Sequence, residues 1–470
     1  MTPPYSLYFH IPFCVHRCAY CDFNTYAGQE EMIPAYVEAL TREIDFVGNK
    51  LRTAQLPNYP TTRLHNYPTT AHTIFFGGGT PSLLSPDQFE SILRSIHAHF
   101  ALTDDAEITI EANPGTVSYE DLLELRRIGI NRISYGVQSA NTEELQMLER
   151  AHNFFDVIEA VTAARKAGFK DLNLDLIYGL PGQVPSTWQT TVKRILDLHP
   201  EHISAYALTL EHGTPFGRCA SKGLLPLSDP DLAAEMYEWA GNVLEANGYV
   251  QYEISNWAKT NAEGRMQNEG RMRNEGRMQN NEYKSAHSSF RIPPSSFACR
   301  HNLQYWRGLP YLAFGAGAHG YANGYRYSNV LRIKTYIDRL ANYQTTHYQT
   351  ANYQSANYQL PNYQFPLSPA TVNHHKQTLR DDMSEFMITG LRLTQEGISE
   401  EEFQARFGQS LHEVYGKEIE DLLKLGLIEI PSPIRAECCA NEAGRGGRGK
   451  GIRLSRRGRL LGNQVFVRFV

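Results

Sequence analysis

The chain has 470 residues and a mass of 53.3 kDa, with 41% apolar residues, a mean hydropathy of −0.43 and a net charge of −5. This composition is typical of a globular protein of two or three domains, and the acidic charge argues against nucleic acid as the main partner. No run approaches the ~20 apolar residues of a membrane span, and we expect no signal peptide, so we predict a cytoplasmic protein.

The first half of the chain alternates short apolar, β-branched runs with helical patterns. Strands are predicted at 6–12, 72–78, 107–113, 132–137, 171–179 and 202–210. Helices are predicted between them, at 33–47, 86–100, 118–129 and 156–168, from apolar residues spaced three and four apart. Regular β-α alternation produces a parallel sheet with right-handed crossovers. We therefore predict an α/β fold, a partial (β/α)6 TIM-like barrel.

Three repetitive stretches interrupt this pattern. NYPTT occurs at 58–62 and 66–70, EGRM recurs from 263 to 278, and a Tyr-Gln pair recurs from Tyr343 to Tyr363. Their composition favours disordered insertions. We predict a barrel domain at 1–215, an extension at 216–335 with an insertion at 260–298, a Tyr/Gln-rich insertion at 336–374 and a C-terminal domain at 375–470.

The C-terminal domain is predicted to be mainly helical. Helices are expected at 381–393 and 399–408, the segment 411–430 passes from helix to strand, and a short hairpin follows. This order indicates a winged-helix-like α+β domain. Its second helix is acidic, which favours a structural or partner-docking role over DNA binding.

Three cysteines crowd into eight positions. Cys14, Cys18 and Cys21 have the spacing C-x3-C-x2-C at the end of the first predicted strand. Three thiolates can hold three irons of a [4Fe–4S] cluster and leave the fourth iron open to a small molecule. The alternative is a zinc site with His10 or His16 as the fourth ligand, although zinc ligands usually come as two separated pairs.

Glycines and polar residues follow the ends of the other predicted strands. Gly77, Gly78 and Gly79 end the second strand and permit close approach of a ligand to the backbone. Glu111 and Gln138 lie at the ends of the third and fourth strands. Any one of these polar residues could be a satisfied core group, but several at one barrel rim favour a ligand site.

The opening HIPFC-x3-C-x2-C-DF resembles the radical S-adenosylmethionine (SAM) superfamily, in the branch of oxygen-independent coproporphyrinogen III oxidases and HemW-type heme chaperones. The resemblance implies that an open iron of the cluster chelates SAM. It also implies the SAM-contacting residues, which are Tyr8, Tyr20, Gly78, Gly79, Thr80, Glu111, Gln138, Arg150, Asp175 and Thr209.

Two motifs separate the two members of this branch. The oxidases continue the cysteine motif with a fourth cysteine, where this chain has Phe23. HNLQYW at 301–306 matches the HNxxYW motif of the heme chaperones, which implies that His301 ligates heme. Imidazole is a common axial ligand of heme iron. Residue chemistry alone would make His301 a satisfied core or surface histidine.

We therefore predict a heme chaperone with a SAM-binding [4Fe–4S] cluster. Its expected partners are heme, recipient apo-hemoproteins and an electron donor, and a homodimer is left open. Whether SAM is cleaved, and hence whether the protein is an enzyme, is also left open. The first alternative is a coproporphyrinogen III oxidase. The second is a zinc-stabilised interaction protein that uses its winged-helix-like domain.

Overall fold

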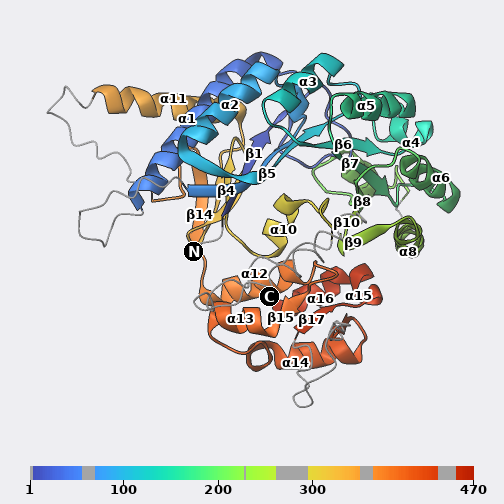
Figure 1. The fold of residues 1–470 in the computed structure, drawn as a ribbon. Helices are drawn as coiled ribbons and strands as arrows, with labels where there is room; N and C mark the ends of the chain where they lie inside the picture. Colours follow the sequence, from blue (N-terminus) through green and yellow to red (C-terminus); the bar gives the residue numbers. More distant parts are fainter. Residues whose placement is uncertain (1–3, 55–68, 227–228, 261–294, 350–363, 432–450) are drawn as a thin grey trace, which may run out of the picture. The chain divides into compact units, whose positions relative to one another are not determined.

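The computed structural model describes residues 4–54, 69–226, 229–260, 295–349, 364–431 and 451–470 (Figure 1). The chain forms two compact units. The barrel unit contains Thr2–Ala240 and Pro310–Lys376, and the second unit contains Gly241–Leu309 and Gln377–Val470. The domain limits at 215, 335 and 374 stay a prediction.

Parallel strands form the centre of the barrel unit, in the spatial order β1-β4-β5-β6-β7-β8. They are β1 (Tyr5–Ile11), β4 (Thr69–Gly78), β5 (Phe100–Ala112), β6 (Arg132–Gln138), β7 (Asp171–Tyr178) and β8 (His202–Ala207). Spatial order equals the order along the chain, as in a barrel whose consecutive parallel strands are neighbours. The partial (β/α)6 barrel is confirmed.

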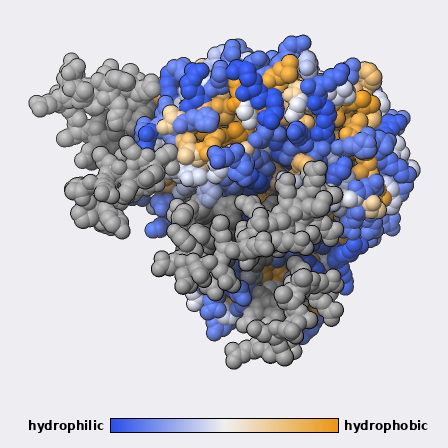
Figure 2. All heavy atoms as spheres, in the orientation of Figure 1, coloured by the Kyte–Doolittle hydropathy of each residue, from blue (hydrophilic) through white to orange (hydrophobic). Residues whose placement is uncertain are grey.

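Helices follow the strands and cover the outer face of the sheet, as Figure 1 shows for α1, α2, α3 and α5. They are α1 (Ile33–Ala54), α2 (Pro86–His99), α3 (Tyr119–Arg127), α4 (Thr142–Met147), α5 (Phe154–Lys166), α6 (Pro185–Leu196), α7 (Pro215–Ser221) and α8 (Pro230–Ala246), which runs across the division at 240. Hydrophilic residues dominate the coloured part of the face in Figure 2, with patches of apolar residues among them. Phe155 on α5 is an exposed apolar residue.

Local signals explain where these helices begin and end. Ser85 caps α2 by accepting a hydrogen bond from the Gln88 amide at 3.3 Å, while the Gln88 side chain accepts one from the Ser85 amide at 2.9 Å. α5 ends before Gly168, whose φ of +92° is strained for any residue with a Cβ atom. The helix limits predicted from the sequence are right to within a few residues, except that α1 continues to Ala54.

The sheet of the barrel unit continues on the other side of β1. β11 (Tyr311–Phe314) pairs with β1 in parallel, and β12 (His319–Ala322), β13 (Tyr325–Asn329) and β14 (Thr371–Lys376) follow antiparallel. α11 (Ile333–Gln349) packs against α1. The Tyr/Gln repeat was therefore wrongly predicted as disordered at its beginning, because α11 includes its first members. Residues 350–363 and the EGRM repeats lie outside the described residues.

A buried carboxylate joins α1 to this extension. Glu43 Oε2 accepts hydrogen bonds from the Gly315 amide at 2.9 Å and the Tyr336 hydroxyl at 2.7 Å. Its Oε1 accepts from Asn329 Nδ2 at 2.8 Å and from the Ser368 hydroxyl at 2.7 Å. Burial raises the pKa of Glu43. Four donors from four separate segments thus converge on one side chain, which fixes the 315–318 loop against the barrel.

The second unit contains the predicted winged-helix-like domain. β9 (Tyr249–Glu253) and β10 (Asn256–Lys259) form an antiparallel hairpin, and α10 (Arg300–Trp306) carries the HNLQYW segment. The C-terminal elements are α12 (Leu379–Gly390), β15 (Ile398–Ser399), α13 (Glu400–Phe407), α14 (Leu411–Lys424), β16 (Ile428–Glu429), β17 (Gly451–Leu454), α15 (Arg456–Leu460) and α16 (Gly462–Phe466).

The small sheet of this domain has the order β15-β17-β16, with an antiparallel pairing of β16 and β17. Helices α12, α13 and α14 pack on it through a common apolar core that includes Met387, Phe403, Leu411 and Ile419. Three helices and a three-stranded antiparallel sheet confirm the winged-helix-like architecture. Within the described part of the chain, none of the helices has the length and apolarity to cross a bilayer.

Candidate functional site

The cysteine motif forms a loop at the end of β1. Cys14 ends the short strand β2 (Phe13–Cys14), which pairs in parallel with β3 (Tyr26–Ala27), and this pairing closes the loop between them. A turn inside the loop is fixed by the Cys21 amide, which donates to the Cys18 carbonyl at 3.0 Å. Cys14 is buried, whereas Cys18 and Cys21 are partly exposed.

Each thiol has a polar neighbour from the barrel or the loop. The Thr80 hydroxyl donates to Cys14 Sγ at 3.6 Å, Cys21 Sγ lies 3.9 Å from the Thr25 hydroxyl, and Arg150 Nη1 donates to Cys18 Sγ at 3.6 Å. Burial raises the pKa of the Cys14 and Cys21 thiols. Because thiolates are the metal-binding form, loading a cluster here releases protons.

His10 anchors this loop through both of its ring nitrogens. Its Nδ1 lies 3.0 Å from the Tyr8 hydroxyl, and its Nε2 lies 3.0 Å from the Asn24 carbonyl oxygen. Asn24 in turn donates to the Ala316 and Leu331 carbonyls, at 3.1 and 3.0 Å. His16 Nε2 contacts Glu149 instead. Both histidines of the zinc alternative are thus engaged in other contacts, His10 through both ring nitrogens and His16 through Nε2.

Among the described residues, no group of three or more His, Cys, Asp or Glu side chains is placed to hold one metal ion. A [4Fe–4S] cluster differs, because each thiolate binds a different iron and the sulfurs need not converge on one point. The backbone at Gly79 packs so closely against the cysteine loop that no side chain fits there. A Cβ atom on Gly79 would lie 3.0 Å from Cys14 Sγ and 2.5 Å from the Phe13 carbonyl oxygen.

The predicted SAM residues gather at the carboxyl ends of the parallel strands. Most of them are partly exposed where their strand neighbours are buried, whereas Thr80 is buried, so this rim borders accessible space. The Gly78 amide donates to Glu111 Oε2 at 2.9 Å, and Gly78 has a φ of +113°. Burial, together with the nearby Asp175, raises the pKa of Glu111 to about 7. Burial likewise raises the pKa of Tyr8, which lies close to Glu111.

Asp175 on β7 is held by its neighbours across the sheet. The Ser134 hydroxyl donates to Asp175 Oδ2 at 2.7 Å, and Asn173 Nδ2 donates to its Oδ1 at 2.9 Å. Burial raises its pKa in spite of these bonds. Gln138 ends β6 with a φ of +69°, which is uncommon for a residue with a Cβ atom and often marks a functional position.

Arg150 connects the rim to the cysteine loop. Besides Cys18, its guanidinium donates to the Gly136 carbonyl at 2.7 Å and to Asn113 Oδ1. Asn113 Nδ2 donates to the Thr80 hydroxyl at 3.0 Å. Tyr20 lies beside Arg150, and burial raises the pKa of its hydroxyl. Asn113 was not among the predicted site residues, although a polar amide as the last residue of a predicted strand was the available signal.

Thr209 is the exception among the predicted SAM residues. β8 was expected to reach residue 210 but ends at Ala207, so Thr209 lies in the connection that follows and is exposed. The remaining candidates share contacts that centre on β1, β4, β5, β6 and β7. The structure thus brings together the cysteine loop, the glycine segment and the two carboxylates.

His301 lies on α10 in the second unit. It is 1% exposed, and its Nε2 lies 2.7 Å from the Tyr305 hydroxyl, one helical turn further on. The two rings meet edge to face with centroids 4.9 Å apart. In this arrangement the nitrogen that most often binds heme iron is occupied by a phenol.

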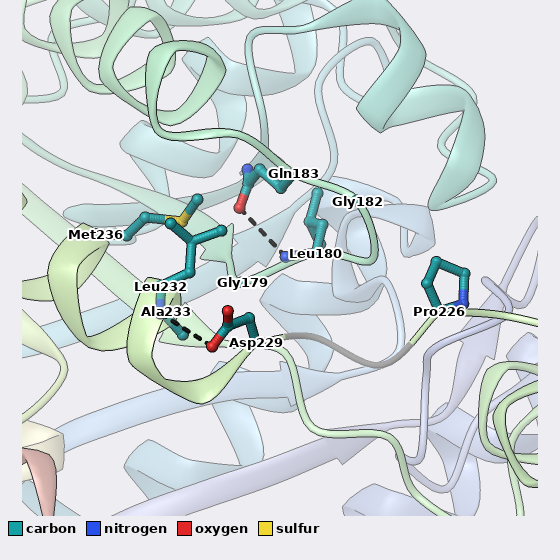
Figure 3. A pocket seen from close by; sticks show the side chains of 9 residues that line it. All are labelled: Gly179, Leu180, Gly182, Gln183, Pro226, Asp229, Leu232, Ala233 and Met236. Carbon is teal, nitrogen blue, oxygen red and sulfur yellow. Dashed lines mark hydrogen bonds between the residues drawn. The ribbon is translucent and has the colours of Figure 1, made fainter.

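The structure also has a cavity of about 200 Å³ beside the loop after β7 (Figure 3). It is lined by Gly179, Leu180, Gly182, Gln183, Pro226, Asp229, Leu232, Ala233 and Met236. Gln183 Oε1 accepts from the Leu180 amide at 3.2 Å and so braces the loop. None of the predicted cofactor residues lines this cavity.

Comparison with known proteins agrees with this geometry. The Radical SAM superfamily profile matches residues 8–195, and the HemN C-terminal domain profile matches residues 377–432. The heme chaperone HemW of Bacillus subtilis is 32% identical over 470 residues, 99% of each chain. The chain belongs to the HemW family of the radical SAM superfamily.

One further relative and one solved structure are also similar to this chain. The heme chaperone HemW of Escherichia coli is 37% identical over 320 residues, which cover 68% of this chain and 70% of that relative. Among solved structures, the coproporphyrinogen III oxidase HemN of Escherichia coli has a TM-score of 0.70 at 21% identity and covers 100% of this chain and 90% of its own. That likeness establishes the shared fold.

Membership of the superfamily implies SAM and a [4Fe–4S] cluster as cofactors. The residues present fit both groups, because three thiols lie in a closed loop beside a glycine segment that admits no Cβ atom. Such a cluster, when bound, supplies an open iron for SAM and an electron for its cleavage.

Proposed function

We propose that this protein binds heme through His301 and transfers it to apo-hemoproteins. The proposal also includes a [4Fe–4S] cluster on Cys14, Cys18 and Cys21 and a SAM molecule at the strand-end rim. The observation that carries the heme assignment is the HNLQYW segment, folded as α10 with His301 facing Tyr305. The names of the HemW relatives support it.

The proposed SAM site uses the chemistry of the rim. The carboxylates of Glu111 and Asp175 suit ribose hydroxyls and the positive charges of SAM, and Arg150 suits its carboxylate. Gly78, Gly79 and Thr80 offer the backbone and hydroxyl groups beside Cys14. Tyr8, Tyr20 and Gln138 complete the walls, and Thr209 is the outlying member of the set.

The proposed partners are heme, the recipient apo-hemoproteins and an electron donor for the cluster. A homodimer is a further proposal. We also propose a cytoplasmic location, which the free thiols of Cys14, Cys18 and Cys21 support because reducing compartments keep thiols reduced.

The test is an anaerobic heme titration of the cluster-loaded full chain, followed by its Soret band. We expect saturation near one heme per chain, and His301→Ala should weaken binding at least tenfold. His319→Ala is the matched control, because His319 is exposed and lies in the barrel unit. Full binding by His301→Ala would overturn the ligand assignment.

The same preparation tests the alternative that the protein is a coproporphyrinogen III oxidase. Phe23 occupies the position of a fourth cysteine, so we expect no conversion of coproporphyrinogen III in the presence of SAM and reductant. Turnover by a wild-type protein that binds no heme would replace the chaperone proposal with the oxidase.

A further inference from the structure

A guanidinium lies on the last aromatic residue of the HNLQYW segment. The guanidinium carbon of Arg392 is 4.3 Å from the centroid of the Trp306 ring. Arg392 follows α12, and its side chain is 27% exposed. The stack fixes the plane of the guanidinium while leaving it accessible from solvent.

Among the described residues, Arg392 has an ion pair with Glu253 but no hydrogen bond. Its nearest acid is Glu253, whose Oε2 lies 3.8 Å from Arg392 Nη2, too far for a hydrogen bond. Among the described residues, the guanidinium makes no hydrogen bond, and Arg392 Nε is buried without a partner. Arg307, directly after Trp306, differs from Arg392, because its guanidinium donates hydrogen bonds of 2.7 and 3.1 Å to the Glu396 carboxylate.

Two further polar atoms near Arg392 are, like its Nε, buried without a hydrogen-bond partner in the described part of the chain. The Trp306 indole Nε1 and Glu253 Oε2 are both buried and lack a hydrogen-bond partner within the described chain. Glu253 Oε1, in contrast, accepts from the Ser255 amide at 2.9 Å and from Asn256. A buried donor without a partner is costly, and Arg392 Nε and Trp306 Nε1 are two such donors next to one partly exposed guanidinium, which indicates a place for an incoming acceptor.

We infer that Arg392, seated on Trp306, anchors a propionate carboxylate of the bound heme. This inference rests on the proposed function. Propionates are the carboxylate groups at the edge of heme, and a guanidinium fork matches a carboxylate in a bidentate way. His301 and Trp306 are the first and last residues of the HNLQYW segment, and both lie on α10. One short helix thus supplies both the iron ligand and the support of the anchor.

The inference is tested by comparing heme with a heme whose two propionates are esterified. Heme and heme dimethyl ester, which has no free carboxylate, are titrated into the full chain under identical anaerobic conditions. We expect the wild type to bind heme at least tenfold more tightly than the ester. Arg392→Ala should weaken heme binding about ten- to a hundredfold and change ester binding less than twofold, since only the carboxylate contact is lost.

Two variants sharpen the comparison. Arg392→Lys keeps the charge but loses the fork, so its heme affinity should lie between those of the wild type and Arg392→Ala. Arg326→Ala is the matched control, because Arg326 is also stacked on a ring, at 4.5 Å from the Tyr321 centroid, but belongs to the barrel unit. It should leave both affinities unchanged.

The outcomes separate the two proposals. Equal weakening of heme and ester by Arg392→Ala assigns Arg392 a purely structural role and overturns the inference. So does a wild type that binds heme and ester equally, which is informative even when Arg392→Ala does not fold. A wild type that binds neither compound overturns the proposed function itself, and the inference with it.

Discussion

Replacing Glu111 with glutamine should remove a pH dependence from SAM binding. The pKa of Glu111 is raised to about 7 by burial and by Asp175, so the carboxyl of the free protein is largely protonated at pH 6 and ionised at pH 8. SAM carries a sulfonium and an ammonium group, and it therefore binds the ionised form better. Below pH 7 binding must release a proton, and affinity falls as the pH falls.

The size of the effect follows from linkage. For one group with a pKa of about 7, affinity should rise about tenfold from pH 6 to pH 8, with most of the change below pH 7. The α-amino group of SAM titrates with an ordinary pKa near 7.7–8.0, which adds its own pH dependence. The decisive quantity is therefore the difference between the wild type and Glu111→Gln.

The assay is anaerobic equilibrium dialysis of SAM with cluster-loaded protein, in half-unit steps from pH 6 to 8. Glu111→Gln should bind SAM more weakly at pH 8 and lose the tenfold rise. Glu144→Gln is the control, since Glu144 is also buried but bonds Ser139 and Thr187. An unchanged slope in Glu111→Gln would refute the reasoning.

Three other changes have definite expected results. Tyr305→Phe should tighten heme binding about fivefold in a Soret titration, because the iron no longer displaces a phenol from His301; weaker binding would mean that the phenol positions the ring for ligation. Glu43→Gln should lower the free energy of unfolding in urea by about 3 kcal/mol, while Glu38→Gln on the exposed face of α1 should change it by less than about 0.5 kcal/mol. Cys18→Ser should lose the brown absorbance of the cluster, and a variant that still holds four irons per chain would contradict the cysteine assignment.

The strands and the rim could be predicted because their signals are local. Apolar runs and helical spacings identify the β-α units, and order along the chain then fixes the parallel sheet. Glu111 and Asp175 stand out because charged residues are rare inside apolar strands. Their meeting at one edge follows from the direction of parallel strands alone.

The Glu43 network could not be predicted, because its partners are remote in sequence. Glu43 lies on an amphipathic helix, where a glutamate normally faces solvent, and its donors lie 272 to 325 positions away. The parallel pairing of β11 with β1 is equally non-local. The helical start of the Tyr/Gln repeat was missed for a different reason, since a repetitive composition conceals the continuation of α11.

The contact of His301 with Tyr305 could have been anticipated from the sequence. Residues four apart on a helix meet, so the HNxxYW spacing itself places the phenol beside the imidazole. The stack of Arg392 on Trp306 could not, because it joins residues 86 positions apart whose pairing depends on how α12 ends.

Without SAM, the buried carboxylates of the rim lower the free energy of unfolding once they are ionised. The pKa of Glu111 is raised from 4.5 to about 7, so the folded state binds a proton more tightly than the unfolded state, and stability falls as the pH rises through this window by about 3 kcal/mol. A ligand that brings positive charge to Glu111 and Asp175 reverses that loss. SAM should therefore stabilise the fold more strongly at pH 8 than at pH 6, because tenfold tighter binding enlarges the mass-action stabilisation by up to about 1.4 kcal/mol. Charged residues inside apolar strands, such as Glu111 and Asp175, are thus the ones whose unfavourable burial is offset by the ligand. They are unusual in the sequence itself, so they can be predicted more readily than the buried Glu43.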